Sequence, residues 1–121
     1  MKGIGVDLCE VDRMRAALSR TPTLRDRIFT PTEQDYSERR TDPSERYAAR
    51  WAAKEAVLKA LEAGVGACRW VEIEVVRAPS GAPSVALHGT AAALAADRGI
   101  TRWLLTMTHT HRLAEAIAVA L

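Results

Sequence analysis

One helical segment, Tyr47 to Leu61, constrains the fold more than any other part of the chain. At 100° per residue its large side chains share one face, and six alanines cover most of the remaining surface. Both sides are therefore expected to be buried. Ionised groups persist between packed surfaces only when they are paired, hydrogen-bonded or in contact with a ligand or metal. The large residues are Tyr47, Trp51, Leu58 and Leu61, and the charged ones are Arg50, Lys54, Glu55 and Lys59.

The length of 121 residues suits a single domain that covers residues 1–121. Apolar residues make up 48% of the chain but aromatic residues only 5%, so the core must consist mainly of Ala, Leu, Val and Ile. The net charge is only +2 and the arginines are spread along the chain, which argues against a protein that coats nucleic acid. We therefore expect no nucleic-acid partner.

The sequence carries no pattern for export or for a membrane. Asp7 and Glu10 interrupt the only early apolar run, and no segment approaches the length of a membrane span. Cys9 and Cys68 lack the paired spacing of a zinc or redox motif, so we interpret both as reduced, structural thiols. We expect a cytoplasmic protein with no membrane partner.

The N-terminal residues predict a strand from Gly3 to Val11. Apolar side chains alternate there with small or polar ones, which places the two sets on opposite faces of the strand. Asp7 therefore points away from Ile4 and Val6. The apolar set is Ile4, Val6 and Leu8, and the second set is Gly5, Asp7 and Cys9.

Helix signals follow this strand. Asp12 is expected to cap a helix that runs to about Leu18, and the next stretch predicts a short helix with Leu24 and Ile28 facing inward.

Two further helices are predicted from a repeated start signal. Thr30-Pro31-Thr32-Glu33 and Asp42-Pro43-Ser44-Glu45 each place a capping residue, a proline and a glutamate in N-cap, N1 and N3 order. The second helix contains the alanine-rich segment and is expected to end at Gly64 and Gly66.

The second half of the chain predicts a hairpin, a helix and two final strands. Pro and Gly residues between Ala78 and Pro83 indicate the hairpin turn, and an alanine-rich helix is expected to begin at a Thr90 cap and to end at Gly99. The fold class is therefore α+β, with an antiparallel sheet packed on a long central helix. The predicted strands are Trp70 to Val76, Ser84 to Leu87, Arg102 to Thr108 and Leu113 to Ala120.

Asp7 and Glu55 are the first candidates for chemistry, because an acid on a strand and an acid on a buried helix can converge on a hard cation. Two carboxylates suit Mg²⁺, which keeps several waters and takes its remaining ligands from substrate phosphates. The alternative is structural: Asp7 could pair with an arginine, and Glu55 with Lys59 one turn later.

Arg50, Lys54 and Lys59 could together hold a phosphate or pyrophosphate. Lys54 is the one we interpret as structural, since it projects into the middle of the apolar face, where its stem can pack while its amine reaches solvent.

Histidines are the last candidates. His109 and His111 share a face at the end of a strand, where one could donate to a phosphate, but two histidines without a third ligand do not indicate a metal site. His88 is interpreted as a loop or cap residue. No glycine-rich phosphate loop and no nucleophile motif is found, so covalent catalysis is not expected.

Four motifs together resemble one family. They occur in family order and at family-like spacing from one end of the chain to the other, and the first two are the most specific. The chain resembles holo-acyl-carrier-protein synthase, the small, single-domain type of 4′-phosphopantetheinyl transferase. The motifs are Gly5-Val6-Asp7-Leu8-Cys9-Glu10-Val11-Asp12-Arg13, Arg50-Trp51-Ala52-Ala53-Lys54-Glu55-Ala56, Gly81-Ala82-Pro83 and Thr106-Met107-Thr108-His109-Thr110.

The resemblance implies transfer of 4′-phosphopantetheine from coenzyme A to a serine of apo acyl carrier protein, with release of adenosine 3′,5′-bisphosphate, in support of fatty acid synthesis. It implies catalytic roles for Asp7, Glu55 and Lys59. The first two match the family's Mg²⁺ ligands, and Lys59 matches a basic residue near the pyrophosphate. The residues that match its contacts to coenzyme A are Arg50, His109, Gly81 and Pro83.

The resemblance also implies a homotrimer with active sites between subunits, which would explain a helix that is buried on every side and still carries charge. Carrier proteins are typically acidic, so the arginines at positions 13–27 are a docking candidate, with Arg13 the best match to the family. The alternative for these arginines is a solvated helical face.

Three residues or pairs depart from the family pattern. Thr106 and Thr108 replace the usual serines of the histidine motif, His111 is unusual, and Leu24 stands where many relatives carry an aromatic residue that meets the carrier protein.

Two alternative functions stay open: a transferase for polyketide or peptide carriers, and a non-catalytic trimer that binds phosphate or protein.

Overall fold

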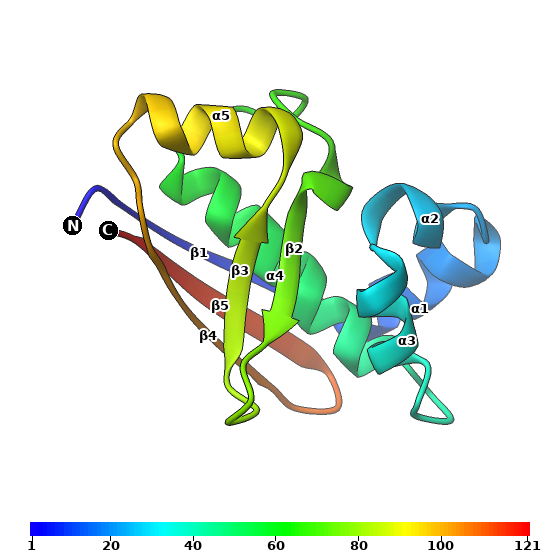
Figure 1. The fold of residues 1–121 in the computed structure, drawn as a ribbon. Helices are drawn as coiled ribbons and strands as arrows, with labels where there is room; N and C mark the ends of the chain where they lie inside the picture. Colours follow the sequence, from blue (N-terminus) through cyan, green and yellow to red (C-terminus); the bar gives the residue numbers. More distant parts are fainter.

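A computed structural model describes all residues from 1 to 121 and confirms the α+β class (Figure 1). None of its helices is long and apolar enough to cross a lipid bilayer. The helices are α1 (Val11–Arg20), α2 (Leu24–Ile28), α3 (Pro31–Ser37), α4 (Ser44–Ala60), the 3₁₀ turn η1 (Trp70–Glu72) and α5 (Gly89–Asp97). The strands are β1 (Gly3–Glu10), β2 (Ile73–Arg77), β3 (Pro83–Leu87), β4 (Trp103–His109) and β5 (Leu113–Ala120).

Helix α4 lies between two antiparallel sheets, as its two buried sides require. Strands β1, β5 and β4 form a three-stranded sheet in that order, and β2 and β3 form a separate hairpin. Figure 1 shows the hairpin in front of α4 and the three-stranded sheet behind it, with α1, α2 and α3 gathered at one end. The prediction of an antiparallel sheet on a long central helix is thus confirmed, and a second sheet covers the other side of that helix.

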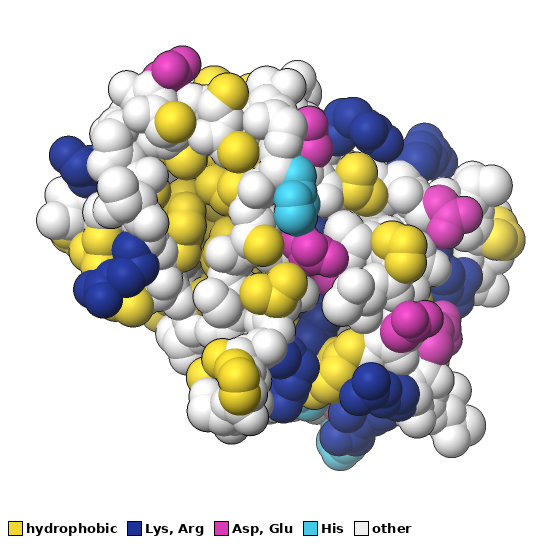
Figure 2. Space-filling view, in the orientation of Figure 1, with side chains coloured by type: hydrophobic (Ala, Val, Ile, Leu, Met, Phe, Trp, Pro, Cys, Tyr) yellow, Lys and Arg dark blue, Asp and Glu magenta, His cyan; other side chains and the backbone are white.

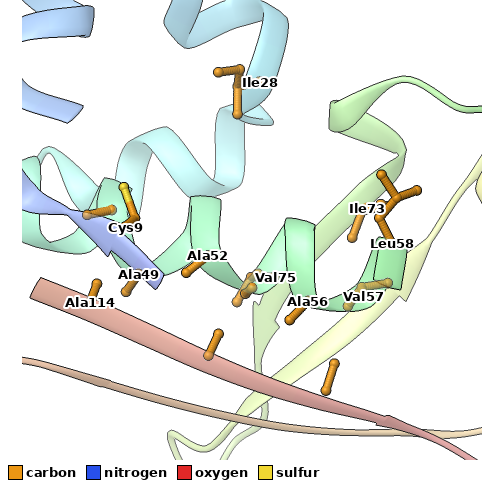
Figure 3. Close-up of a cluster of buried hydrophobic side chains, with 14 of the residues drawn as sticks. Cys9, Ile28, Ala49, Ala52, Ala56, Val57, Leu58, Ile73, Val75 and Ala114 are labelled. Atoms are coloured by element: carbon orange, nitrogen blue, oxygen red, sulfur yellow. The ribbon is translucent and has the colours of Figure 1, made fainter. Parts of the chain in front are cut away.

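Small residues let the backbone of α4 approach the three-stranded sheet closely. A Cβ atom on Gly5 would collide with the carbonyl group of Ala56, and one on Gly3 would collide with that of Ala60. Alternate alanines of β5 complete this contact, all of them buried (Figure 3). Glycine at Gly5 is therefore a packing requirement that brings the neighbouring Asp7 close to α4. The β5 alanines are Ala114, Ala116, Ala118 and Ala120.

The opposite side of α4 packs larger side chains. Val57 and Leu58 of α4 and Ile73 and Val75 of β2 belong to the same buried hydrophobic cluster (Figure 3). At the start of the helix the rings of Tyr47 and Phe29 are 4.6 Å apart, a distance typical of aromatic pairs in cores. The hairpin and α3 are therefore fixed to the side of α4 that faces away from the three-stranded sheet.

The face of the three-stranded sheet that points away from α4 is apolar and exposed, and we call it the outer sheet face. Strand register puts Ile4 beside Val119, which pairs in turn with Leu104. Ile4 is 60% exposed, Leu104 50% and Val6 49%. Single exposed apolar residues are normal, whereas a contiguous set across three strands indicates an interaction surface. Its residues are Ile4, Val6, Leu8, Leu104 and Ile117.

Two predicted helix caps are wrong. Asp12 lies inside the first turn of α1, where its carboxylate bonds Arg15 instead of the backbone. Thr90 lies inside α5, and the carboxylate of Glu72, 18 residues earlier in the chain, accepts a hydrogen bond from its backbone N–H at 3.1 Å. In both cases a partner other than the local backbone determines the geometry at the helix start.

The predicted ends of α4 also differ from the structure. The helix begins at Ser44, whose backbone N–H donates to the Asp42 carboxylate at 3.1 Å. It ends at Ala60, before the glycines, because Glu62 adopts a left-handed conformation with a φ of 55°. The N–H groups of Glu62 and Ala63 then bond the carbonyls of Lys59 and Leu58, which closes the helix.

Other predictions hold with small shifts. Thr30 and Glu33 form the predicted capping box at the start of α3, and Gly99 follows the end of α5 with a φ of 70°. The predicted strand from Trp70 to Val76 begins only at Ile73, because its first three residues form η1.

Candidate functional site

Asp7 and Glu55 converge, because Gly5 and Ala56 bring β1 and α4 together just beside them. The Asp7 side chain is directed towards α4, on the opposite face of the strand from Val6, and lies close enough to the Glu55 carboxyl to raise its pKa. The backbone N–H of Leu8 donates to the Asp7 carboxylate at 2.8 Å, which holds that side chain in place. Two carboxyl groups from different elements thus share one half-buried position.

This contact changes the protonation of Glu55. Its burial and the neighbouring Asp7 carboxyl raise the pKa of Glu55 to about 7, in that order of importance. The pair can therefore be stabilised either by a shared proton or by a cation between the two carboxyls. The donor set of two carboxylate groups fits Mg²⁺, which needs few protein oxygens. No cluster of three or more metal-binding side chains occurs in the structure.

Lys59 lies beside the same two acids. Its ammonium group donates to the carbonyl of Val6 at 3.0 Å and is 3.7 Å from the Asp7 carboxylate. It forms no ion pair with Glu55, so the structural alternative of a pair along the helix does not occur. The half-exposed amine keeps donor capacity for a phosphate. We call Asp7, Glu55 and Lys59 the acidic half-site.

A cavity of about 780 Å³ opens on the acidic half-site. Asp7 and Glu55 line it together with Arg13 and Leu24, the two residues for which a docking role was predicted from the sequence. The edge-to-face pair of Trp51 and Trp70, with ring centroids 4.5 Å apart, forms part of its apolar wall. The cavity therefore connects the acid pair with helices α1 and α2.

Cys9 also lines this cavity but does not act as a nucleophile in it. Burial, with a contribution from the nearby Glu55, raises the pKa of the Cys9 thiol to about 11. The thiol is thus protonated at neutral pH. Both cysteines are free, in agreement with the prediction.

Arg50 projects from a different side of α4, towards α3 and β2. Only 3% of it is exposed, and its guanidinium carbon lies 4.3 Å from the ring centre of Tyr36. Arg46 and Arg77 approach the same ring, at 4.1 and 4.5 Å. The sequence analysis missed Tyr36, Arg46 and Arg77, and no local signal could have found them, since they come from three elements. We call these three residues and Arg50 the arginine half-site.

The predicted nucleotide loop lies beside the arginine half-site. Arg77 pairs with Pro83 in the β2–β3 hairpin. Gly81 has a φ of 88°, and a Cβ atom there would lie 3.3 Å from a terminal nitrogen of Arg77. The structure therefore brings Gly81 and Pro83 close to Arg50 through Arg77 and Tyr36.

His109 lies at the same end of α4. Its Nδ1 is 3.9 Å from the carboxylate of Glu45, the residue that directly precedes Arg46. His111 is closer, with its Nδ1 at 2.9 Å from the same carboxylate. His88 occupies the N-cap position of α5 and bonds Glu74, in agreement with a cap residue.

Lys54 is structural, but the prediction that its amine reaches solvent is wrong. The amine is fully buried and lies 2.8 Å from the carboxylate of Glu33, which is also fully buried. It donates to the carbonyls of Trp70 and Ile73 as well, so all three of its protons are used. Burial lowers the pKa of Lys54. The amine is held inside because Glu33 is already fixed by the capping box of α3.

The two half-sites are separate within one chain. Arg50 and Lys59 are nine residues apart on α4, which places them on opposite sides of the helix. The cavity of about 430 Å³ at the arginine half-site shares no lining residue with the cavity at the acidic half-site. Within one chain the predicted site residues therefore fall into two separate clusters.

Comparisons with known proteins agree on one family. A family model described as the 4′-phosphopantetheinyl transferase superfamily matches residues 3–116. Holo-[acyl-carrier-protein] synthases from Beutenbergia cavernae and Desulforudis audaxviator are 49% and 50% identical to the chain over 98% of its length, and the matches cover 96% and 91% of those proteins. Among solved structures, the holo-[acyl-carrier-protein] synthase of Neisseria meningitidis has a TM-score of 0.90 at 28% identity. The superposition covers the whole of this chain and 98% of the Neisseria chain. The holo-[acyl-carrier-protein] synthase of Helicobacter pylori, in complex with coenzyme A, has a TM-score of 0.86 at 25% identity. The superposition covers 98% of this chain and 99% of the Helicobacter chain.

Proposed function

We propose that this chain, which belongs to the 4′-phosphopantetheinyl transferase superfamily, transfers 4′-phosphopantetheine from coenzyme A to a serine of apo acyl carrier protein. The products are holo carrier protein and adenosine 3′,5′-bisphosphate, and the reaction supports fatty acid synthesis. The observation that carries this conclusion is the sequence identity of 49% and 50%, over 98% of the chain, to two proteins named holo-[acyl-carrier-protein] synthase.

Asp7 and Glu55 are proposed to hold Mg²⁺ in the acidic half-site. The fit rests on two neighbouring carboxyl groups whose only ion pair within 4.0 Å is the one from Asp7 to Lys59, at 3.7 Å. When bound, the metal supplies positive charge that neutralises phosphate oxygens as the phosphoryl group is transferred.

The chemistry is the attack of the serine oxygen on the β-phosphorus of coenzyme A, with cleavage of the bond to the bridging pyrophosphate oxygen. Lys59 is fixed by the Val6 carbonyl and donates to the pyrophosphate, where negative charge develops on the leaving group. The serine proton needs an acceptor, and Glu55 is the candidate among the protein side chains: with a pKa of about 7, its ionised carboxylate accepts a proton at neutral pH more readily than an ordinary carboxylate does.

The arginine half-site is proposed to bind the nucleotide part of coenzyme A. Arg50 contributes a guanidinium fork, and Gly81 and Pro83 form a rigid turn beside it that can contact the base. His109, half-exposed at the end of β4, supplies a further donor for a phosphate.

A homotrimer is proposed to complete each site across a subunit boundary. The outer sheet face supplies an apolar surface over three strands that needs a partner, and a second copy of the chain offers a matching apolar face. Each acidic half-site can then meet the arginine half-site of a neighbouring chain.

The carrier protein is proposed to dock over α1 and α2, beside the cavity of the acid pair. Arg13 and Leu24 line this cavity and can offer a cation and an apolar contact to an acidic carrier surface.

Intact-protein mass spectrometry tests the activity. An apo acyl carrier protein incubated with coenzyme A, Mg²⁺ and this protein should gain the mass of one phosphopantetheine, and Asp7→Ala should abolish the gain. Asp97→Ala, which removes an exposed acid at the end of α5, is the control and should behave as the parent does. A panel of fatty acid, polyketide and peptide carriers identifies the preferred acceptor. No gain on any carrier by the folded parent would contradict the activity and favour a non-catalytic binding protein.

A further inference from the structure

Tyr36 of α3 holds three arginines from two other elements. The guanidinium carbons of Arg46, Arg50 and Arg77 lie 4.1, 4.3 and 4.5 Å from its ring centre. Arg77 also donates to the Tyr36 hydroxyl, and Arg46 donates to the Tyr36 carbonyl, each at 2.6 Å. One side chain thus determines where three positive charges are placed, by its ring and by its polar atoms.

These three cations lack an anionic partner. None of the guanidinium groups lies within 4.0 Å of a carboxylate, although the chain forms four arginine–carboxylate pairs elsewhere. Glu33, the nearest buried acid, is already used by Lys54 and by the backbone N–H groups of Thr30 and Val75. Cation–π contacts ease the mutual repulsion of the arginines but do not neutralise their charge.

The absence of an anionic partner is clearest at Arg50. It is nearly fully buried, its Nε has no acceptor, and the only recorded hydrogen bond of its guanidinium group is a long one, 3.4 Å, to the carbonyl of Arg46. Buried polar groups of folded proteins are hydrogen-bonded in the large majority of cases. An unsatisfied buried guanidinium group beside two further guanidinium groups indicates that an anion belongs there.

Space for an anion is present. A cavity of about 430 Å³ is lined by Tyr36 and by three arginines, Arg39, Arg50 and Arg77. The acids Glu33 and Asp35 also line it, and Arg46 lies outside the lining. Figure 2 shows basic side chains gathered between the turn of the β2–β3 hairpin and α3, on the same side of the molecule. The cavity therefore lies where basic side chains are concentrated.

We propose that Tyr36 is a positioning residue that holds Arg50 and Arg77 around a phosphate monoester of the nucleotide co-substrate, with Arg46 on the same ring adding a third positive charge. A monoester carries close to two negative charges at neutral pH, which match the guanidinium groups of Arg50 and Arg77 in the cavity lining. The pyrophosphate is assigned to Lys59 on the opposite side of α4, so the ligand of the arginine half-site is a different phosphate. This inference rests on the proposed function, because that function supplies the nucleotide.

Calorimetric binding of two nucleotides, the reaction product and an analogue that lacks its 3′-phosphate, tests the assignment. Adenosine 3′,5′-bisphosphate carries a monoester that adenosine 5′-monophosphate lacks, and both are titrated into the assembled protein. Tyr36→Leu removes the ring and should weaken binding of the bisphosphate roughly tenfold, with less effect on the monophosphate. Tyr36→Phe keeps the ring and should recover most of this loss. Arg102→Gln, an exposed arginine at the start of β4, is the control for charge and should bind both ligands as the parent does.

Kinetics supply the second readout. Tyr36→Leu should raise the KM for coenzyme A about tenfold while kcat stays within about twofold, because the side chain orients a binding group that is remote from the reacting atoms. Arg77→Gln should raise the KM in the same way and serves as the variant of choice if Tyr36→Leu does not fold. A folded Tyr36→Leu or Arg77→Gln protein that binds the bisphosphate as tightly as the parent would overturn the inference, even with transfer activity intact. Binding that depends on Tyr36 in a parent without transfer activity would support the inference while the proposed reaction failed.

Discussion

The buried pair of Lys54 and Glu33 offers the sharpest test of how the site is supported. Glu33 belongs to α3, Lys54 to α4, and the Glu33 carboxylate accepts from Val75 of β2 at 2.8 Å. The same three elements carry Tyr36, Arg50 and Arg77. Lys54→Met keeps the length of the apolar stem but leaves the Glu33 carboxylate buried without its cation. We expect this change to loosen the junction on which the arginine half-site depends.

The magnitude follows from the burial of both partners. Removal of one member of a fully buried ion pair costs about 3–5 kcal/mol of the free energy of unfolding. For a chain of this length the entropy of unfolding is about 0.25 kcal/mol per kelvin, so the melting temperature should fall by roughly 12–20 °C. Glu33→Gln should cost a similar amount. The double variant leaves no buried charge and should cost about 2 kcal/mol less than the sum of the two single changes.

Thermal unfolding of the four proteins at one fixed protein concentration provides the assay, because assembly would otherwise shift the melting temperatures. Arg15 and Asp42 form an exposed pair at 2.8 Å, so Arg15→Met is the control and should leave the melting temperature close to that of the parent. Effects of Lys54→Met and Glu33→Gln that add within about 0.5 kcal/mol would show that the two groups do not stabilise each other, and would refute the argument.

Two further predictions concern the acidic half-site. Gly5→Ala would drive a Cβ atom into the backbone of α4, to 2.9 Å from the carbonyl carbon of Ala56, and should cost about 3 kcal/mol or more in thermal unfolding; a stable, fully active variant would show that β1 has room to move. The pKa of Glu55 is about 7 in the metal-free folded protein, against an ordinary value of 4.5. Between pH 4.5 and about pH 7 the folded state therefore binds more protons than the unfolded state, and the free energy of unfolding falls as the pH rises through this range. Because Mg²⁺ must displace that proton, its affinity measured by calorimetry should be about tenfold higher at a pH near 8 than near 6, and an affinity independent of pH would contradict the shared proton.

Local signals predicted most of the fold. The capping box of Thr30 and Glu33, the alternation along β1 and the glycine at the end of α5 each depend on residues close in sequence, and each occurs as expected. The cap of α5 was mispredicted because its acceptor, Glu72, is 18 residues away. The early end of α4 was missed because Glu62, a residue that rarely takes a positive φ, provides the turn.

The candidate site was predicted in part for the same physical reason. The approach of Asp7 to Glu55 follows from a strand and a helix whose patterns were both clear. Tyr36 and its arginines come from elements that meet only in the folded chain, so no spacing along the sequence indicates them. By contrast, the placement of Arg50 and Lys59 on opposite sides of α4 could have been predicted from the sequence. Nine residues of an α-helix make about two and a half turns, which puts the two side chains on opposite sides.

Mixed oligomers of two inactive variants test most directly whether each site is built from two chains. Asp7→Ala disables the acidic half-site and Arg50→Ala the arginine half-site, and each variant alone should show little or no transfer by mass spectrometry. Proteins assembled together from equal amounts of both should recover activity at about a quarter of their sites, because a neighbour can then supply the half that is missing. Mixed oligomers that form as the parent does and yet remain inactive would show that both half-sites must come from one chain, and would contradict the account.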